Sequence, residues 1–145
     1  MLRRCVAVLG VLVLHACSAG AYGRVKEMRS DTIRGDSIRV VVVLAGESET
    51  ADRQMAARVR AQLDSAGLTT LRRAGTWESE ETALADICPI GQPSDIHAVL
   101  FVWWNQLELR QCATHRRAYH IEGGYRGIEH MVKRLMLYLG VRPVR

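Results

Sequence analysis

Apolar and polar positions along the chain form patterns that predict strands and helices around one central apolar run. Residues 98–104 are all apolar, and many of them are β-branched or aromatic, which favours a strand. A strand that is apolar on both faces needs cover on both, so we expect helices on each side of it. Leu107 and Leu109 then alternate with polar residues, in the phase of Phe101. We therefore predict one long strand over residues 97–109, with one face opening to water in its second half.

Weaker patterns predict the remaining elements of one domain. Apolar runs indicate three further strands, over residues 37–45, 68–74 and 118–125. Apolar residues at helical spacing indicate three helices, over residues 50–66, 79–87 and 128–139. The resulting order is βαβαββα. It predicts a single α/β domain over residues 37–140, in which three helices cover a mixed sheet of about four strands. Residues 141–145 are a short tail.

The amino-terminal segment has the layout of a secretory signal peptide over residues 1–16. A basic stretch over residues 1–4 precedes an apolar run that is too short to span a bilayer as a helix. The run ends in Leu14-His15-Ala16-Cys17, which resembles the lipobox of bacterial lipoproteins, although His15 departs from the residue types usual at its position. The resemblance implies cleavage before Cys17 and lipidation of that cysteine.

Two other fates of this segment stay open. Cleavage after Ala21 would fit the A-x-A pattern and release a soluble protein, and an uncleaved anchor is disfavoured by the short apolar run. Ser18, and not Asp, follows the cysteine, and in lipoproteins of Gram-negative bacteria this implies sorting to the outer membrane. The resemblance therefore implies a place in the cell envelope, on the outer membrane and facing the periplasm. Residues 17–36 are polar and lack a sustained period, so we predict a lipidated cysteine followed by a flexible tether.

The charge balance argues against a nucleic-acid partner. The chain has 145 residues and a formal charge of +5, and removal of Arg3 and Arg4 with the signal leaves 18 basic against 15 acidic residues. The excess is scattered, whereas nucleic-acid binders concentrate their basic residues in a patch or stripe. We therefore predict no nucleic-acid partner, and attachment to a membrane through the lipid anchor.

Two of the four cysteines fall in the predicted domain. In an exported protein, Cys88 and Cys112 most simply form a disulfide, with two separate buried thiols as the alternative. Cys112 also lies near His115 and His120 in the sequence, which suggests a thiol nucleophile with a base or, with Glu122, a metal site. A disulfide would remove the Cys112 thiol from either site. We predict the disulfide, no metal and no cofactor.

Trp104, Gln106 and Glu108 are the candidate partner-binding residues. Trp104 stands where one face of the predicted long strand turns polar, and an aromatic side chain half exposed beside polar groups is a good anchor for a partner. The alternative is that Trp104 packs under a helix. The loop over residues 46–49 follows a predicted strand at the position where open α/β sheets bind ligands, and its acidic residues argue against phosphate.

The predicted order resembles two groups of periplasmic domains: the amino-terminal domain of the Tol-system protein TolB, and the domains of lipoproteins that activate peptidoglycan synthases or assemble curli. Three stretches carry the resemblance, over residues 38–47, 99–125 and 127–140. Residues 111–115 match the hairpin of this group only loosely, so no binding residue is implied. The resemblance implies a non-enzymatic envelope lipoprotein that binds or assembles a protein or cell-wall partner. The alternative is a small exported enzyme that uses Cys112, His115 and His120.

Overall fold

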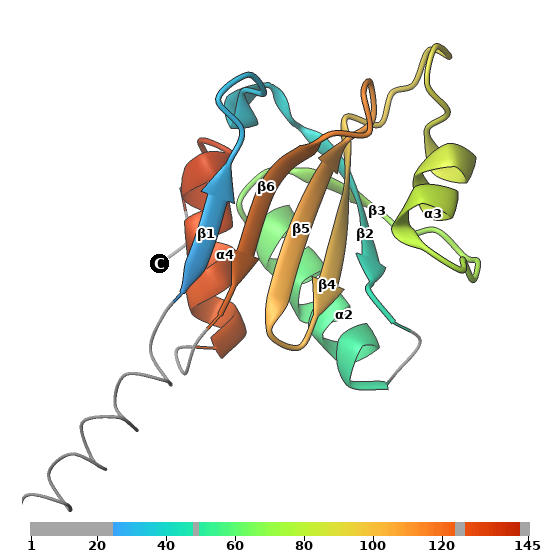
Figure 1. Cartoon of the computed structure of the whole chain (residues 1–145). Coiled ribbons are helices and arrows are strands. Elements are labelled where there is room, and N and C mark those ends of the chain that lie inside the picture. The colour runs from blue at the N-terminus through green and yellow to red at the C-terminus, as the bar shows by residue number, and fades with distance from the viewer. Residues whose placement is uncertain (1–24, 48–49, 124–126, 143–145) are drawn as a thin grey trace, which may run out of the picture.

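A six-stranded mixed sheet organises the chain. The structure, a computed structural model, describes residues 25–47, 50–123 and 127–142, and within these ranges the strand order is β1-β6-β5-β4-β2-β3 (Figure 1). The strands are β1 (Lys26–Arg29), β2 (Val40–Ala45), β3 (Thr69–Leu71), β4 (Ala98–Trp103), β5 (Gln106–Gln111) and β6 (Arg117–Glu122). The helices are the 3-10 turn η1 (Gly35–Ser37), α2 (Thr50–Ser65), α3 (Glu80–Ile87) and α4 (Gly127–Tyr138). The predicted single α/β domain is confirmed, with six strands where about four were expected.

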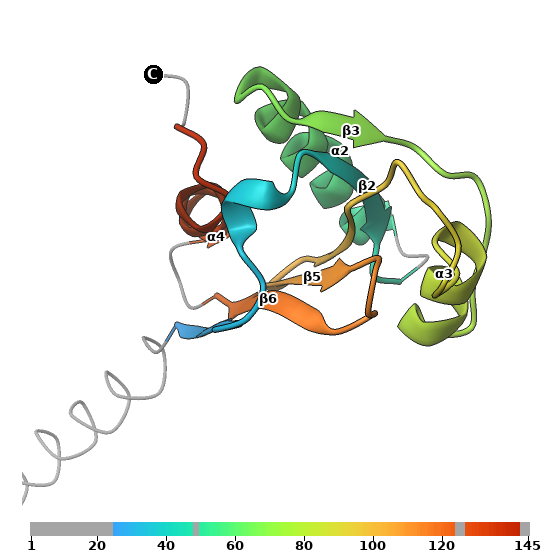
Figure 2. The ribbon, with the colours of Figure 1, turned by 90° about the horizontal axis from the view of Figure 1, so that it is seen from above.

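Helices cover both faces of the sheet, but unequally (Figure 2). β2 pairs in parallel with β3 on one side and with β4 on the other, as crossover connections require. The larger core cluster joins one face of β2 and β4 to α2 and α4, whereas α3 packs on the opposite face. Val41 and Leu100 lie in the first cluster, and Val42 and Val99 lie in the second. The prediction that the central apolar run is covered on both faces is therefore confirmed for β4.

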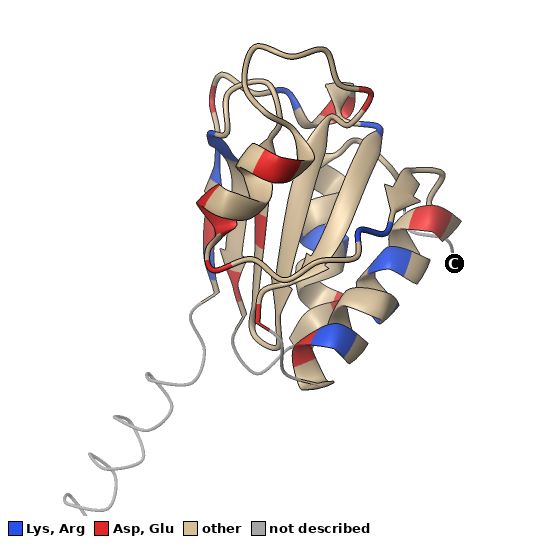
Figure 3. Cartoon of the chain, turned by 90° about the vertical axis from the view of Figure 1, so that its right-hand side faces the viewer, with Lys and Arg blue, Asp and Glu red and all other residues tan. Residues whose placement is uncertain are grey.

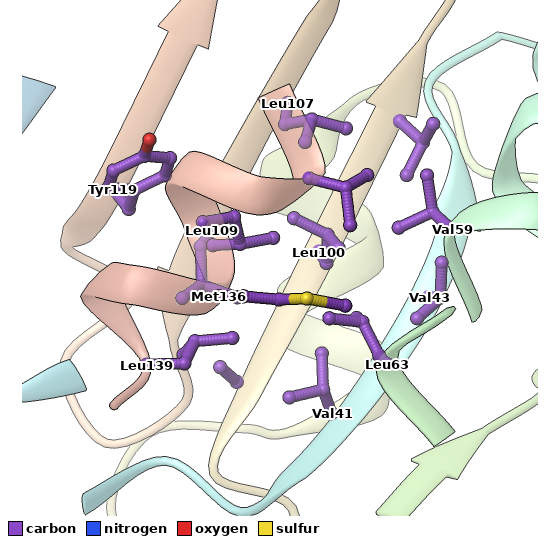
Figure 4. Packing of buried hydrophobic residues seen from close by; sticks show 14 of the residues in the cluster. Val41, Val43, Val59, Leu63, Leu100, Leu107, Leu109, Tyr119, Met136 and Leu139 are labelled. Atoms are coloured by element: carbon purple, nitrogen blue, oxygen red, sulfur yellow. The ribbon is translucent and has the colours of Figure 1, made fainter. Parts of the chain in front are cut away.

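The last helix closes the core. Its apolar residues recur at helical spacing and five of them are buried. Figure 4 shows Met136 beside Leu100, Leu109 and Leu63, so α4 packs against both the sheet and α2. The buried residues of α4 are Ile128, Met131, Val132, Leu135 and Met136. The helix expected over residues 128–139 is thus confirmed as the cover of this face.

The predicted long strand over residues 97–109 is wrong, because the chain turns at Trp104 and Asn105. β4 and β5 form an antiparallel hairpin across this two-residue turn. Asparagine is depleted in strands and common in turns, so Asn105 suits the reversal. Residues paired across a hairpin share one face, so Leu107 joins its partner Val102 in the larger cluster and lies on the opposite face from Phe101.

The predicted tether over residues 17–36 is wrong in its second half. Residues 26–29 form β1, an edge strand antiparallel to β6, and η1 follows at residues 35–37. The sequence hides this strand because three of its four residues are charged. Glu27 is the inward residue, and it accepts hydrogen bonds from Arg134 Nη2 at 2.6 Å and from the Tyr119 hydroxyl at 2.9 Å. The predicted signal peptide and Cys17 lie outside the described residues.

Replacing Glu27 with Gln should remove a pH-dependent part of the stability. Burial raises the pKa of this carboxyl, but hydrogen bonds from Arg134, Arg29 and Tyr119 outweigh burial and leave its pKa below the ordinary value of 4.5. Such a group stabilises the fold above pH 4.5, and the contribution is lost as the pH falls through the lower folded pKa. We expect Glu27→Gln to lower the free energy of unfolding at pH 7 by about 1–2 kcal/mol.

Urea denaturation at a series of pH values checks this prediction. The wild-type free energy of unfolding should fall more steeply below pH 4.5 than that of Glu27→Gln. Asp31→Asn changes an exposed carboxyl in the bend after β1 and serves as the matched control. It should leave the dependence of the free energy of unfolding on pH unchanged. Parallel profiles for the wild type and Glu27→Gln would contradict the prediction.

Candidate functional site

A cleft opens at the carboxyl end of β2. The chain leaves β2 for α2 on one face of the sheet, and it leaves β3 for α3 on the other face. Where neighbouring parallel strands send their connections to opposite faces, a crevice forms at their carboxyl ends. Here the crevice has a volume of about 720 Å³ and lies between α2, the end of β2 and the connecting segment over residues 73–80. This segment reaches α3 without sheet pairing, and Figure 2 shows it arching outside the sheet.

Aromatic side chains form part of the cleft wall. Phe101 and Trp103 come from β4, with ring centroids 6.2 Å apart, and Trp77 comes from the connecting segment. Trp77 Nε1 donates a hydrogen bond to Asp86 Oδ2 at 3.2 Å, which ties the segment to α3. Gly46 lies directly against the Trp103 indole, since a Cβ at this position would come within 2.1 Å of the ring. The aromatic wall is therefore held in place by packing before any ligand binds.

Charged side chains of both signs line the rest of the cleft. Arg53 and Arg60 lie two turns apart on α2, hence on one face of that helix, and Arg73 approaches from the connecting segment. In the part of the chain that the structure describes, none of these three arginines is in an ion pair. The acidic lining residues are Glu47, Glu78 and Glu80. Figure 3 shows that basic and acidic residues are interspersed over this side of the molecule.

The lining is suited to holding a molecule. Arginine donates paired hydrogen bonds to carboxylates and similar groups, and aromatic rings stack on flat or apolar surfaces. The described lining residues include no cysteine or histidine. Ser79 is the N-cap of α3, and its hydroxyl accepts a hydrogen bond from the Thr82 amide at 3.2 Å, so it already has a structural task. The cleft therefore offers groups for stacking and charged hydrogen bonds.

Replacing Gly46 with Ala should disturb the cleft wall. The added methyl group would overlap the Trp103 indole, so the ring or the loop must move. We expect a loss of about 1–3 kcal/mol in the free energy of unfolding, as for other overpacked sites, together with a changed near-ultraviolet circular dichroism spectrum. Ala74→Val, which adds bulk at an exposed position of the connecting segment, is the control and should leave both quantities unchanged. A wild-type spectrum for Gly46→Ala would contradict the prediction.

The predicted partner-binding residues do not share one surface. Trp104 occupies the tip of the β4–β5 turn and is 65% exposed, so the alternative that it packs under a helix is wrong. Gln106 is half-buried, and Glu108 is buried with 2% exposure. Glu108 Oε1 lies 2.5 Å from Arg110 Nε and Glu108 Oε2 lies 3.0 Å from Arg117 Nη2. Glu108 is thus an internal partner of two arginines, whereas Trp104 is free to contact another molecule.

The predicted disulfide is confirmed. Cys88 and Cys112 are bonded, with Cα atoms 5.5 Å apart, and the bond joins the end of α3 to the end of β5. His115 Nε2 lies 2.7 Å from the carbonyl oxygen of Cys88, whereas His120 pairs with Glu108 in the middle of the sheet. The described ranges contain no group of three or more side chains that could hold a metal ion. The alternative site therefore has no Cys112 thiol, and its two histidines lie in different surroundings.

The sequence indicated the place of the cleft but not its lining. Residues 46–49 were expected at the ligand position of the sheet, and Gly46 and Glu47 do line the cleft. Arg73 and Trp77 were missed because the connecting segment has no periodic pattern. Arg53 and Arg60 show one signal, their spacing of two helical turns on the polar face of α2.

The fold and site together define an α/β domain with a cleft at the end of its central parallel strands. No protein-family model matches the chain, and no curated protein matches it. Among solved structures, the PelC dodecamer from Paraburkholderia phytofirmans has a TM-score of 0.48 and 13% sequence identity, over 83% of this chain and 99% of that one. A point variant of the same dodecamer has a TM-score of 0.47 and 15% identity, with the same coverage.

None of the helices that the structure describes is long and apolar enough to cross a membrane.

Proposed function

We propose that this chain is an exported, lipid-anchored module of the cell envelope that binds a partner and carries out no reaction of its own. The disulfide between Cys88 and Cys112 is the observation that carries the proposal. Disulfides persist in oxidising compartments such as the bacterial periplasm and are rare in the cytosol, so this bond supports export by the predicted signal peptide. The same bond occupies the thiol that an enzyme at Cys112 would need.

The cleft supports a binding role. It has a size typical of ligand sites, and it lies where open α/β sheets bind their ligands. Its aromatic rings and arginines can stack on and hydrogen-bond a partner, and its preformed wall lowers the entropy lost on binding. A protein or a cell-wall polymer is the partner class we propose, reached from a lipid anchor at Cys17. The resemblance to TolB-type and lipoprotein periplasmic domains stays a prediction.

Mass spectrometry of the mature protein tests the anchor. We expect an amino terminus at Cys17 that carries acyl chains, and we expect Cys17→Ala to leave the protein unprocessed or release it from the membrane fraction. An amino terminus at Tyr22, which would follow cleavage after Ala21, would contradict lipidation. An intact Met1 on cytosolic protein would contradict export as well.

Site-specific photocrosslinking in native membranes tests the binding role. A photoreactive residue in place of Arg73 stands at the cleft, whereas the same residue in place of Lys133 stands on the exposed side of α4. We expect a discrete adduct from the cleft position and none from the α4 position. Equal adducts from both positions, or none from the cleft, would contradict a binding role for the cleft.

A further inference from the structure

The chain enters the domain at the same end of the sheet as the exposed tip of the β4–β5 hairpin. The strand registers pair Lys26 with Glu122, Glu122 with Gln106, and Gln106 with Trp103. These four residues therefore form one row across the sheet, and Trp104 follows directly after the last of them. Neighbouring strands are about 4.8 Å apart, so three spacings separate Lys26 from Trp103 by about 15 Å. Figure 1 shows the start of β1 and the β4–β5 turn at the same end of the molecule.

Trp104 is presented at this end on a well-supported turn. Of the described residues, five large apolar ones are exposed, and Trp104 is the most exposed of them at 65%. Its backbone amide donates a hydrogen bond to Asp52 Oδ1 at 3.0 Å, and Asp52 itself is only 2% exposed. The turn is thus tied to the first turn of α2 by a buried carboxylate. The indole is therefore presented to solvent on a backbone that is held in place.

The proposed anchor keeps this end close to a bilayer. Seven residues separate Cys17 from Val25, the first described residue. Even a fully extended chain of this length spans no more than about 28 Å. A domain tethered through Cys17 therefore has its entry end, and with it Trp104, within reach of the membrane surface.

We infer that Trp104 inserts into the headgroup layer of the membrane that holds the lipid anchor, and so orients the domain; this inference rests on the proposed lipidation of Cys17. Tryptophan favours the membrane–water interface because its ring is apolar and its N–H can still reach a polar partner. A protein partner fits this tip less well. A stable protein interface buries about 800 Å² on each partner, whereas one indole supplies at most about 250 Å². The residues that follow it in the chain, Asn105 and Gln106, are polar.

Fluorescence quenching by brominated lipids tests the inference on the native lipidated protein. The protein is reconstituted into phosphatidylcholine vesicles that carry bromine on their acyl chains near the headgroups. The chain has three tryptophans, so variants with Phe in place of one Trp assign the quenched emission. We expect Trp104→Phe to lose at least half of the quenching seen in the wild type. Trp77→Phe is the matched control and should keep the wild-type quenching, since Trp77 is half-buried and hydrogen-bonded to Asp86 on α3.

Two readouts separate the inference from the proposed function. Mass spectrometry of each sample reports whether Cys17 is lipidated, and the melting temperature reports whether Trp104→Phe is folded as the wild type is. A lipidated, folded protein whose quenching is the same with and without Trp104 would overturn the inference and leave the anchor standing. A mature protein without lipid on Cys17 would overturn both the anchor and the membrane contact.

Discussion

Replacing Cys88 and Cys112 together with alanine should lower the free energy of unfolding by about 3 kcal/mol. The bond closes a loop with a sequence separation of 24, and closing a loop of this length restricts the unfolded chain. It also holds α3 against the sheet face that this helix covers, with both cysteines buried in the smaller core cluster. For a domain of this size we expect the melting temperature to fall by roughly 10–20 °C. Calorimetry of the double variant measures both quantities.

A reductant provides the control for this prediction. Wild-type protein treated with dithiothreitol should melt where the untreated double variant melts, and the double variant should not respond to the reductant. Unfolded, unreduced mature protein should take up no thiol reagent at Cys88 or Cys112. A double variant as stable as the oxidised wild type would show that the bond contributes little to stability.

Replacing Glu108 with Gln should cost about 2–4 kcal/mol, because it leaves two guanidinium groups beside a neutral amide. The Glu108 side chain is 3% exposed, and its carboxylate contacts Arg110 and Arg117 at 2.5 and 3.0 Å. His120 Nδ1 lies 3.3 Å from the same carboxylate. The carboxylate is buried, whereas the Arg110 and Arg117 side chains are 20% and 39% exposed. The loss should therefore exceed that of a surface ion pair and stay below that of a fully buried one. Urea denaturation at pH 7 measures the change.

Glu122→Gln is the matched control for Glu108. Glu122 stands on the same face of the neighbouring strand and also faces His120, but its side chain is 44% exposed. Exposed ion pairs contribute about 0–1 kcal/mol, so this variant should unfold close to the wild type. Equal losses for the two variants would mean that burial of Glu108 has no special energetic role.

Elements with their own local pattern could be predicted from the sequence. The three helices show apolar spacing and end signals, and Ser79 forms the capping box of α3. The disulfide followed from the export signal and the cysteine count. The β4–β5 turn could not be predicted this way, because Trp104 continues the apolar run of β4 and only the single polar Asn105 marks the reversal. β1 was missed because an edge strand held by ion pairs has no apolar alternation.

The cleft lay beyond sequence reasoning for a different reason. Its lining combines α2, the end of β4 and a segment without regular structure, and their approach depends on how far that segment arches from the sheet. Sequence spacing says nothing of such curvature. Trp104 was predicted to contact a partner from within a long strand. It is exposed for another reason, because it lies in the β4–β5 turn. Glu108 is buried together with charged partners from two strands, Arg110 on β5 and Arg117 on β6. The alternation of polar and apolar residues along one strand does not reveal such pairing.

Both margins of the sheet are poor templates for adding another chain. β3 has three residues, and β1 has four, among which Lys26, Glu27 and Arg29 are charged. Short, charged outer strands offer few free backbone groups in a row, and this discourages the strand-by-strand growth that leads to fibrils. Many molecules of this protein held close together should therefore not join edge to edge through their sheets.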